Sequence, residues 1–182
     1  MSNATLLPIP KRFSIFENFG ELTIEFKWSR IVGIVVMVFA IIWNSFMVLI
    51  ISKMPPEIRY FIVLHAAVGV FMVYFALCQL FNKTTITCTN DALHIKSGPL
   101  PTFNNKNILR MDITQLYFTE KITRGKNSSQ QISYRLHMLD KNNRSIKLIN
   151  YLPDPESARF IEHKLEKFYK IENKKVAGEY DA

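Results

Sequence analysis

The chain has 182 residues, with 23 Lys and Arg against 15 Asp and Glu and a formal net charge of +8. Residues 82–182 alone carry 17 Lys and Arg against 11 Asp and Glu. A basic surplus of this kind suits an anionic membrane surface or a nucleic acid. No zinc-finger, RNP or basic-helix pattern accompanies it, so we exclude nucleic acid as a partner. A solvated basic surface without a specific partner remains the alternative.

Residues 1–20 contain Pro8 and Pro10 and are predicted to form a flexible N-terminal segment. Residues 21–29, ELTIEFKWS, alternate between apolar and polar side chains, which predicts a β-strand. A single strand is not stable alone, so we expect it to join a sheet formed by the C-terminal part of the chain. The start of the chain has no signal-peptide pattern, because the apolar run begins only at Ile31.

Two apolar runs dominate the first half of the chain. Residues 31–52 and residues 60–81 each span 22 positions without a charged side chain. A helix of that length reaches about 33 Å, enough to cross a hydrocarbon core of about 30 Å. The alternative, two buried helices in a soluble core, is disfavoured because the rest of the chain is too short to cover them. The sequence therefore predicts two transmembrane helices.

The orientation of these helices follows from the basic residues around them. The connecting turn carries only Lys53 and Arg59, whereas more basic residues flank the entry and the exit. The positive-inside rule then places both termini in the cytoplasm. We predict a multi-pass protein of the plasma (inner) membrane. The flanking basic residues include Lys11, Arg12, Lys27, Arg30, Lys83 and Lys96.

Residues 82–170 are predicted to form a small antiparallel β domain with a C-terminal capping helix. Asp154 followed by Pro155 is typical of a helix N-terminus, and an apolar stripe with helical spacing follows it. Residues 171–182 are predicted to form a polar tail. The predicted strands cover residues 84–89, 92–96, 108–111, 113–122, 132–138 and 145–151.

The order of elements is one strand, two spanning helices, five or six antiparallel strands and an amphipathic helix. A small curved sheet capped by a C-terminal helix is a pleckstrin-homology-like (PH-like) arrangement. The stretches ELTIEFKW, IIWNSF, HAAVGVFMVYFAL and FNKTTITCTNDALHIKSGPLP resemble a family of bacterial membrane proteins with two spanning helices and a bacterial PH-like domain. The resemblance covers roughly residues 8–170, although many relatives carry an aromatic residue at the position of Thr102. It implies a membrane α+β architecture and no particular activity.

Four polar residues inside the apolar runs are candidates for intramembrane contacts: His65, Asn44, Ser45 and Gln79. An ionisable side chain in a spanning helix raises a functional hypothesis by default, so a proton relay through His65 is one interpretation. We favour a structural role, in which His65 bonds a carbonyl, a hydroxyl or the side chain of Asn44 or Ser45.

The remaining histidines and the cysteines form no recognisable metal or cofactor motif. His94, His137 and His163 are scattered, and Cys78 and Cys88 lack CxxC spacing. The carboxylates that could act as acid and base, Asp112, Glu120, Asp140 and Asp154, are not brought together by any sequence feature. We therefore predict no cofactor, no metal and no enzymatic activity.

Lys121, Arg124 and Lys126 lie in and beside a Gly/Asn/Ser-rich loop and are candidates for contact with anionic lipid headgroups. A solvated hairpin loop is the alternative. The sequence predicts an integral membrane protein that presents a cytosolic PH-like domain as a binding or assembly module. Its expected partners are the lipid bilayer, anionic headgroups, and another membrane protein or a further copy of the chain. The alternative is a subunit of a small oligomeric channel or transporter.

Overall fold

The computed structural model describes residues 9–10, 12–55, 57, 59–124 and 130–180. The chain divides into two compact units. The first, here called the α+β unit, comprises Met1–Phe26, Thr85–Lys96 and Asn104–Ala182. The second, here called the hairpin unit, comprises Lys27–Thr84 and Ser97–Phe103. The described residues form an α+β fold with three helices and two antiparallel sheets.

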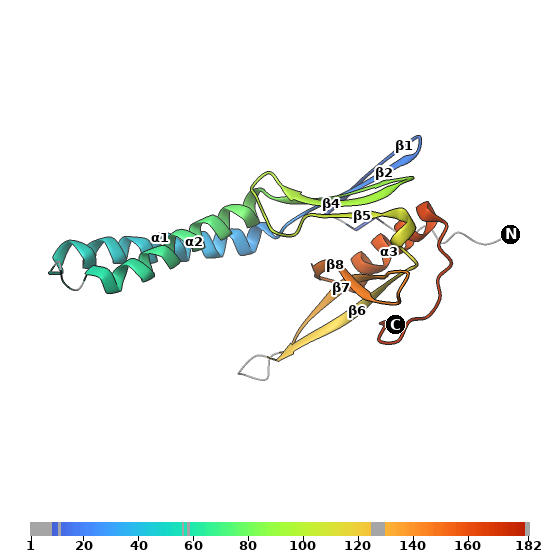
Figure 1. The fold of residues 1–182 in the computed structure, drawn as a ribbon. Coiled ribbons are helices and arrows are strands. Elements are labelled where there is room, and N and C mark those ends of the chain that lie inside the picture. The colour runs from blue at the N-terminus through green and yellow to red at the C-terminus, as the bar shows by residue number, and fades with distance from the viewer. Residues whose placement is uncertain (1–8, 11, 56, 58, 125–129, 181–182) are drawn as a thin grey trace. The chain divides into compact units, whose positions relative to one another are not determined.

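The hairpin unit contains the helices α1 (Arg30–Lys53) and α2 (Arg59–Phe81), which Figure 1 shows as a long pair. Each helix differs from the predicted run by at most one residue at either end. Both helices are long and apolar enough to cross a membrane. Only 11% of the apolar window in α1 and 17% of that in α2 is buried. The pair therefore presents most of its apolar side chains outward, unlike the helices of a soluble core.

Small residues line the contact between α1 and α2. On α1 the buried residues are Gly33, Ala40 and Met47, which lie seven positions apart. On α2 the buried Gly69 and Ala76 follow the same spacing. A repeat of seven keeps one narrow stripe of each helix facing its neighbour, and small side chains let the two backbones approach closely.

The segment 97–103 belongs to the hairpin unit rather than to the β domain predicted over residues 82–170. The reason is a pair of hydrogen bonds just after α2. The Asn82 side chain donates to the Leu100 carbonyl at 3.1 Å and accepts from the Leu100 amide at 2.8 Å. Asn82 is buried, so this pairing satisfies a polar side chain that would otherwise be unfavourable there.

Two sheets are present, where the sequence predicted one curved sheet. The first has the order β1-β2-β3-β4-β5 and the second β6-β7-β8. The 3-10 helix η2 (Arg110–Asp112) separates β5 from β6. The strands are β1 (Phe13–Asn18), β2 (Glu21–Lys27), β3 (Lys83–Thr89), β4 (Ala92–Gly98), β5 (Lys106–Leu109), β6 (Gln115–Arg124), β7 (Gln130–Leu139) and β8 (Ser145–Leu152).

Strand β1 corrects the prediction that residues 1–20 form a flexible segment, because part of that range is an ordered strand. β1 and β2 form an antiparallel hairpin through the two-residue turn Phe19–Gly20. Gly20 adopts φ +79°, a conformation that glycine accepts without steric penalty. Phe13 and Ile15 pack against the hydrophobic core, which gives the strand its second source of stability.

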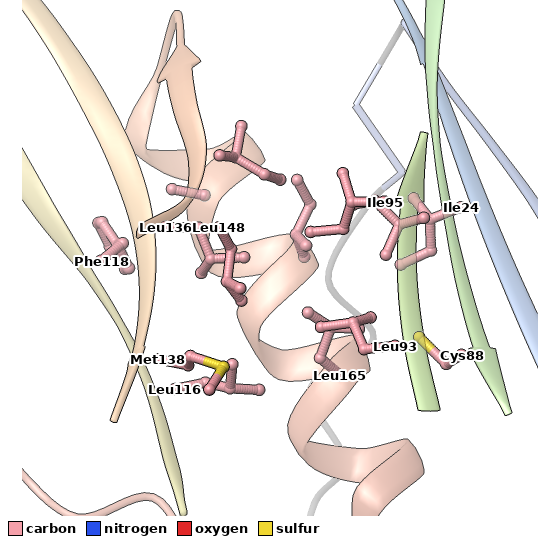
Figure 2. Packing of buried hydrophobic residues seen from close by; sticks show 14 of the residues in the cluster. Ile24, Cys88, Leu93, Ile95, Leu116, Phe118, Leu136, Met138, Leu148 and Leu165 are labelled. Atoms are coloured by element: carbon pink, nitrogen blue, oxygen red, sulfur yellow. The ribbon is translucent and has the colours of Figure 1, made fainter. Parts of the chain in front are cut away.

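One hydrophobic core joins both sheets to helix α3 (Pro155–Tyr169). Figure 2 shows Leu165 of α3 between Leu116 and Met138 of the three-stranded sheet and Leu93 and Cys88 of the five-stranded sheet. All five side chains are at most 1% exposed. The helix is therefore the central layer of the α+β unit.

Helix α3 begins where the sequence predicts. Asp154 is the N-cap, and its Oδ1 accepts a hydrogen bond from the Ser157 amide at 2.6 Å. Pro155 occupies the first turn, where its missing N–H is not needed. The sequence signal was sufficient here because the cap is entirely local.

Of the C-terminal segment 171–182, predicted to be a polar tail, the described residues 171–180 are docked on the α+β unit through Tyr180. The Tyr180 amide donates to the Phe118 carbonyl at 2.9 Å, at the free edge of β6. Its ring lies 5.5 Å from that of Phe118 and 5.2 Å from that of Tyr134. An aromatic side chain and an unpaired strand edge thus hold a segment whose composition is mostly polar.

Candidate functional site

The polar residues of the helices lie in separate environments. Asn44 donates from Nδ2 to the Ala40 carbonyl at 2.6 Å, one turn earlier in α1. Its side chain also lies against Gly69 of α2, where any Cβ atom would overlap its amide group. Asn44 is therefore satisfied inside the hairpin and fills the space that the glycine leaves.

His65 contacts Trp43. The two ring centroids lie 6.2 Å apart at 76°, and Trp43 Nε1 donates to the His65 carbonyl at 3.3 Å. Among the described residues, no hydrogen bond joins the His65 side chain to Asn44 or Ser45. Both His65 and Ser45 are exposed. The His65 ring thus meets an aromatic ring, and the expected bond to a carbonyl, a hydroxyl or the side chain of Asn44 or Ser45 is not seen among the described residues.

Gln79 lies at the other end of the hairpin. A Cβ atom on Gly33 would come within 3.1 Å of Gln79 Cβ and 2.8 Å of Leu80 Cγ. Asn44 lies eleven residues further along α1, about 16 Å away at 1.5 Å per residue. The predicted intramembrane residues therefore do not form one polar path within a single chain.

The predicted headgroup residues lie along β6. Lys121 is paired with Ser133, and Arg124 is paired with Gln130 at the end of the ladder. Because they are three positions apart in a strand, their side chains point to opposite faces of the sheet. Lys126 lies outside the described residues. Lys121 and Arg124 therefore lie at the same end of the hairpin but on opposite faces of the sheet.

The same end of the β6–β7 hairpin exposes an apolar pair. Ile122 and Ile132 lie directly opposite each other and are 50% and 43% exposed. They share the face of Arg124, two residues further along β6. We call these three residues together with Lys121 the hairpin tip. Exposed isoleucine beside basic residues is an arrangement suited to the headgroup region of a bilayer.

The face of β6–β8 that points away from the core carries a second group of cations. Phe118 and Leu136 point into the core, so their neighbours in the strands point outward. Lys106 of β5 reaches β8, where its Nζ donates to the Lys147 carbonyl, and its charge acts on His137 of this face. We call this set the basic face; it comprises Lys106, Thr119, Arg135, His137, Ser145 and Lys147.

The charges of the basic face act on one another. Burial, followed by the charges of Lys147, Arg135 and Lys106, lowers the pKa of His137. Burial also lowers the pKa of Lys106, and the Lys147 charge adds to this effect. Within the described part of the chain, no ion pair includes Lys106, Arg135 or Lys147. The face is therefore a local positive field without a counter-charge of its own.

Hydroxyl groups surround His137. Its Nδ1 lies 3.1 Å from Ser145 Oγ and its Nε2 lies 3.3 Å from Thr119 Oγ1. The Tyr117 ring stacks on the imidazole at 5.3 Å, and its hydroxyl lies 2.5 Å from Ser145 Oγ. A hydroxyl rather than a carboxylate thus faces each nitrogen of His137. The geometry suits binding better than activation of Ser145 as a nucleophile, which needs an oriented base.

A buried acidic pair lies on α3. Glu162 and Glu166, one turn apart, are 5% and 7% exposed, and each has a buried Oε1 without a hydrogen-bond partner among the described residues. Burial raises the pKa of Glu162 to about 8, and the carboxylates of Glu166 and Glu179 add to the rise. Burial raises the pKa of Glu166 to about 7, although a hydrogen bond with Asn173 acts in the opposite direction.

The cysteines are both free and buried. Cys88 is fully buried, and burial raises the pKa of its thiol to about 12, which makes it an inert core side chain. Among the described residues, no three His, Cys, Asp or Glu side chains are grouped so that they could hold a metal ion.

Sequence reasoning missed both the basic face and the acidic pair. His137 was noted only as one of three scattered histidines. The basic residues Arg135 and Lys147 could have indicated the basic face, since both occupy outward positions of neighbouring strands. Recognising that they share a face requires the register of β7 and β8. No protein-family model matches the chain, and no curated protein sequence matches it either.

Proposed function

We propose that this chain is an integral inner-membrane protein that presents a cytosolic PH-like module for binding or assembly at the membrane surface. In this proposal α1 and α2 cross the bilayer, both termini are cytoplasmic, and the chain is a member of the bacterial two-helix family that it resembles. The module acts by binding and carries out no reaction of its own.

The observation that carries this proposal is the outward apolar surface of the hairpin unit. Phe39, Ile42, Leu49 and Leu64 are between 49% and 70% exposed. In water such a surface would be unfavourable by about 25 cal/mol per Å², whereas lipid tails solvate it without penalty. Neither helix has an acidic residue in its first turn, where an acid commonly stabilises a helix in water.

Support for a PH-like module comes from the arrangement of the α+β unit. Two antiparallel sheets and a C-terminal helix share one core, and the helix follows the last strand after two residues. This agrees with the order of elements in PH-like domains. Because function resides in sites and not in folds, the likeness supports a binding role without naming the ligand.

Support for contact with the membrane surface comes from the hairpin tip. Arg124 and Lys121 gain about 1 kcal/mol each beside anionic lipids, and Ile122 and Ile132 can enter the interfacial region. A channel is less well supported, because Asn44 and Gln79 already occupy positions inside the hairpin.

The experiment compares the full chain in two kinds of nanodisc, one of phosphatidylcholine alone and one that also contains phosphatidylglycerol. Hydrogen exchange at residues 119–124 and 130–133 should slow in the anionic discs. The double variant Lys121→Glu with Arg124→Glu should remove the difference. The matched control, Lys141→Glu with Lys167→Glu, reverses two exposed charges elsewhere on the unit and should retain it. Equal exchange of the unmodified chain in both discs would contradict the headgroup contact.

A further inference from the structure

The basic face contains a buried donor that lacks an acceptor. Arg135 Nε is buried and has no hydrogen-bond partner among the described residues. An unsatisfied charged donor is more unfavourable than an unsatisfied neutral one. Such a group in a folded protein calls for an explanation. An anion that draws the guanidinium toward itself would give the Nε–H an acceptor.

The cations around Arg135 make that acceptor an anion. Lys147 of β8 lies opposite His137 of β7, and Lys106 of β5 donates from its Nζ to the Lys147 carbonyl. Neighbouring strands lie about 4.8 Å apart, so cations on adjacent strands can reach a single small group. Three positive charges so close together repel one another until an anion offsets them.

We propose that the basic face binds a phosphoryl group of the monoester type, held by Arg135, Lys147 and Lys106. The guanidinium of Arg135 offers a planar set of N–H donors that matches two phosphate oxygens, and the lysines act as point charges. Thr119 and Ser145 place hydroxyl groups beside His137, where they can donate to the remaining oxygens.

A dianion suits this site better than a carboxylate or a polyanion. Two negative charges offset more of the three cations than a single carboxylate charge does. A nucleic acid would need exposed aromatic rings for stacking, whereas Tyr117 is only 5% exposed because His137 and Ser145 lie against it. His137 would also take up a proton as the anion neutralises the charges that oppose its protonation.

This proposal is independent of the membrane proposal, because soluble phosphate tests it without any anionic lipid. The phosphoryl group can come from a lipid headgroup with a terminal phosphate or from a soluble phosphate ester. The two sources share the chemistry, and the experiment separates them. Arg124 and the exposed isoleucines of the hairpin tip point to the opposite face of the sheet, whereas Lys121, two residues beyond Thr119, shares the face of the basic set.

The experiment measures binding by the full chain in phosphatidylcholine nanodiscs. One arm adds inorganic phosphate or glycerol 3-phosphate at constant ionic strength, with chloride as the reference. The other arm replaces part of the lipid with phosphatidic acid, which has a monoester phosphate, or with phosphatidylglycerol, which has a diester. We expect thermal stabilisation by phosphate over chloride, or by phosphatidic acid over phosphatidylglycerol. Either result supports the site and identifies the source.

Variants locate the binding. Arg135→Lys keeps the charge but removes the buried Nε–H, and it should weaken phosphate binding about tenfold, the equivalent of one charged hydrogen bond. Lys147→Gln should weaken it by a similar factor. The control Lys167→Gln removes an exposed charge from α3 and should bind as the unmodified chain does. If Arg135→Lys binds phosphate with unchanged affinity, the proposed role of the buried donor is wrong.

A measurement on the unmodified chain keeps the proposal testable if those variants fail to fold. The NMR signals of the His137 ring report its protonation as the pH changes. Phosphate should move the His137 titration to higher pH, whereas chloride at the same ionic strength should not. The same titration in both salts, together with equal thermal stability, would overturn the proposal.

Discussion

The hairpin unit and the α+β unit use the same apolar residue types in opposite ways. In the hairpin, large side chains such as Leu49 and Phe71 are more than 60% exposed, and glycine and alanine occupy the contact between helices. In the α+β unit, Leu136 and Leu165 are fully buried, and of the charged side chains described there only Glu162 and Glu166 are buried. The contrast shows that the two units place their large apolar side chains differently, outward in the hairpin and inward in the α+β unit, which is the arrangement that the proposed lipid environment of the hairpin requires.

The two units can also be compared by the hydrogen-bond partners of their buried polar groups. In the hairpin, Asn44 satisfies its donor locally, one turn back in its own helix. In the α+β unit, Arg135, Glu162 and Glu166 keep buried polar atoms without partners among the described residues. The hairpin unit holds one such atom as well, Thr102 Oγ1, so three of the four unpartnered atoms among the described residues lie in the α+β unit.

The largest effect on stability is expected when one leucine in each unit is truncated to alanine and the two losses are compared. Leu136→Ala should lower the free energy of unfolding by about 2–5 kcal/mol, because it opens a cavity in the core. Leu49→Ala removes the same atoms from a surface that faces lipid and should change stability by less than about 1 kcal/mol. Pulse proteolysis of the full chain in nanodiscs, across a urea series, measures both. Equal losses in the two variants would contradict the assignment of different solvents.

A second substitution examines the helix contact. Gly69→Val should destabilise the hairpin by about 1–3 kcal/mol, because the added side chain overlaps the Asn44 amide. Ala67→Val adds similar bulk to an exposed position two residues away and should have little effect. Thermal unfolding followed by circular dichroism in detergent compares the two. Adding Asn44→Ala to Gly69→Val should restore part of the loss, and no recovery would argue against this contact.

The smallest expected effect is pH dependence in the α+β unit. Glu162 and Glu166 bind protons more tightly in the folded chain, with pKa values of about 8 and about 7 against an ordinary 4.5. Stability should therefore fall as pH rises from about 4.5 to about 8, and then level off. Glu162→Gln should raise the free energy of unfolding at pH 8 by roughly 1–2 kcal/mol and leave it nearly unchanged at pH 5.

The control for that prediction is Glu172→Gln, which alters a carboxylate whose side chain is 87% exposed. Urea unfolding at pH 5 and at pH 8 gives the comparison. If Glu162→Gln and Glu172→Gln have the same effect at pH 8, the raised pKa of Glu162 does not contribute to stability.

The parts of the fold that depend on local signals could be predicted from the sequence. The two long helices could be predicted because each is a long run without a charged residue, and α3 because Asp154 and Pro155 mark its start. Strand β1 was missed because its order depends on pairing with β2 and on contacts with the core. The local sequence around β1 contains no signal for those contacts.

The candidate site depended on long-range register, which the sequence does not reveal. Lys106, Arg135 and Lys147 come from three strands, and a bulge between β7 and β8 shifts the alignment that brings Lys147 opposite His137. The burial of Glu162 could not be predicted either, since the C-terminal segment expected to be free is docked and brings the Glu179 carboxylate close to it.

The most direct test of the account asks whether α1 lies in the hydrocarbon of a bilayer. The chain has two tryptophans, Trp28 before α1 and Trp43 near its middle. In vesicles whose lipids carry bromine at the centre of the acyl chains, we expect strong quenching of the fluorescence. The variant Trp43→Phe, which leaves only Trp28, should be quenched much less. Weak quenching of the unmodified chain, equal to that of Trp43→Phe, would contradict the membrane anchor.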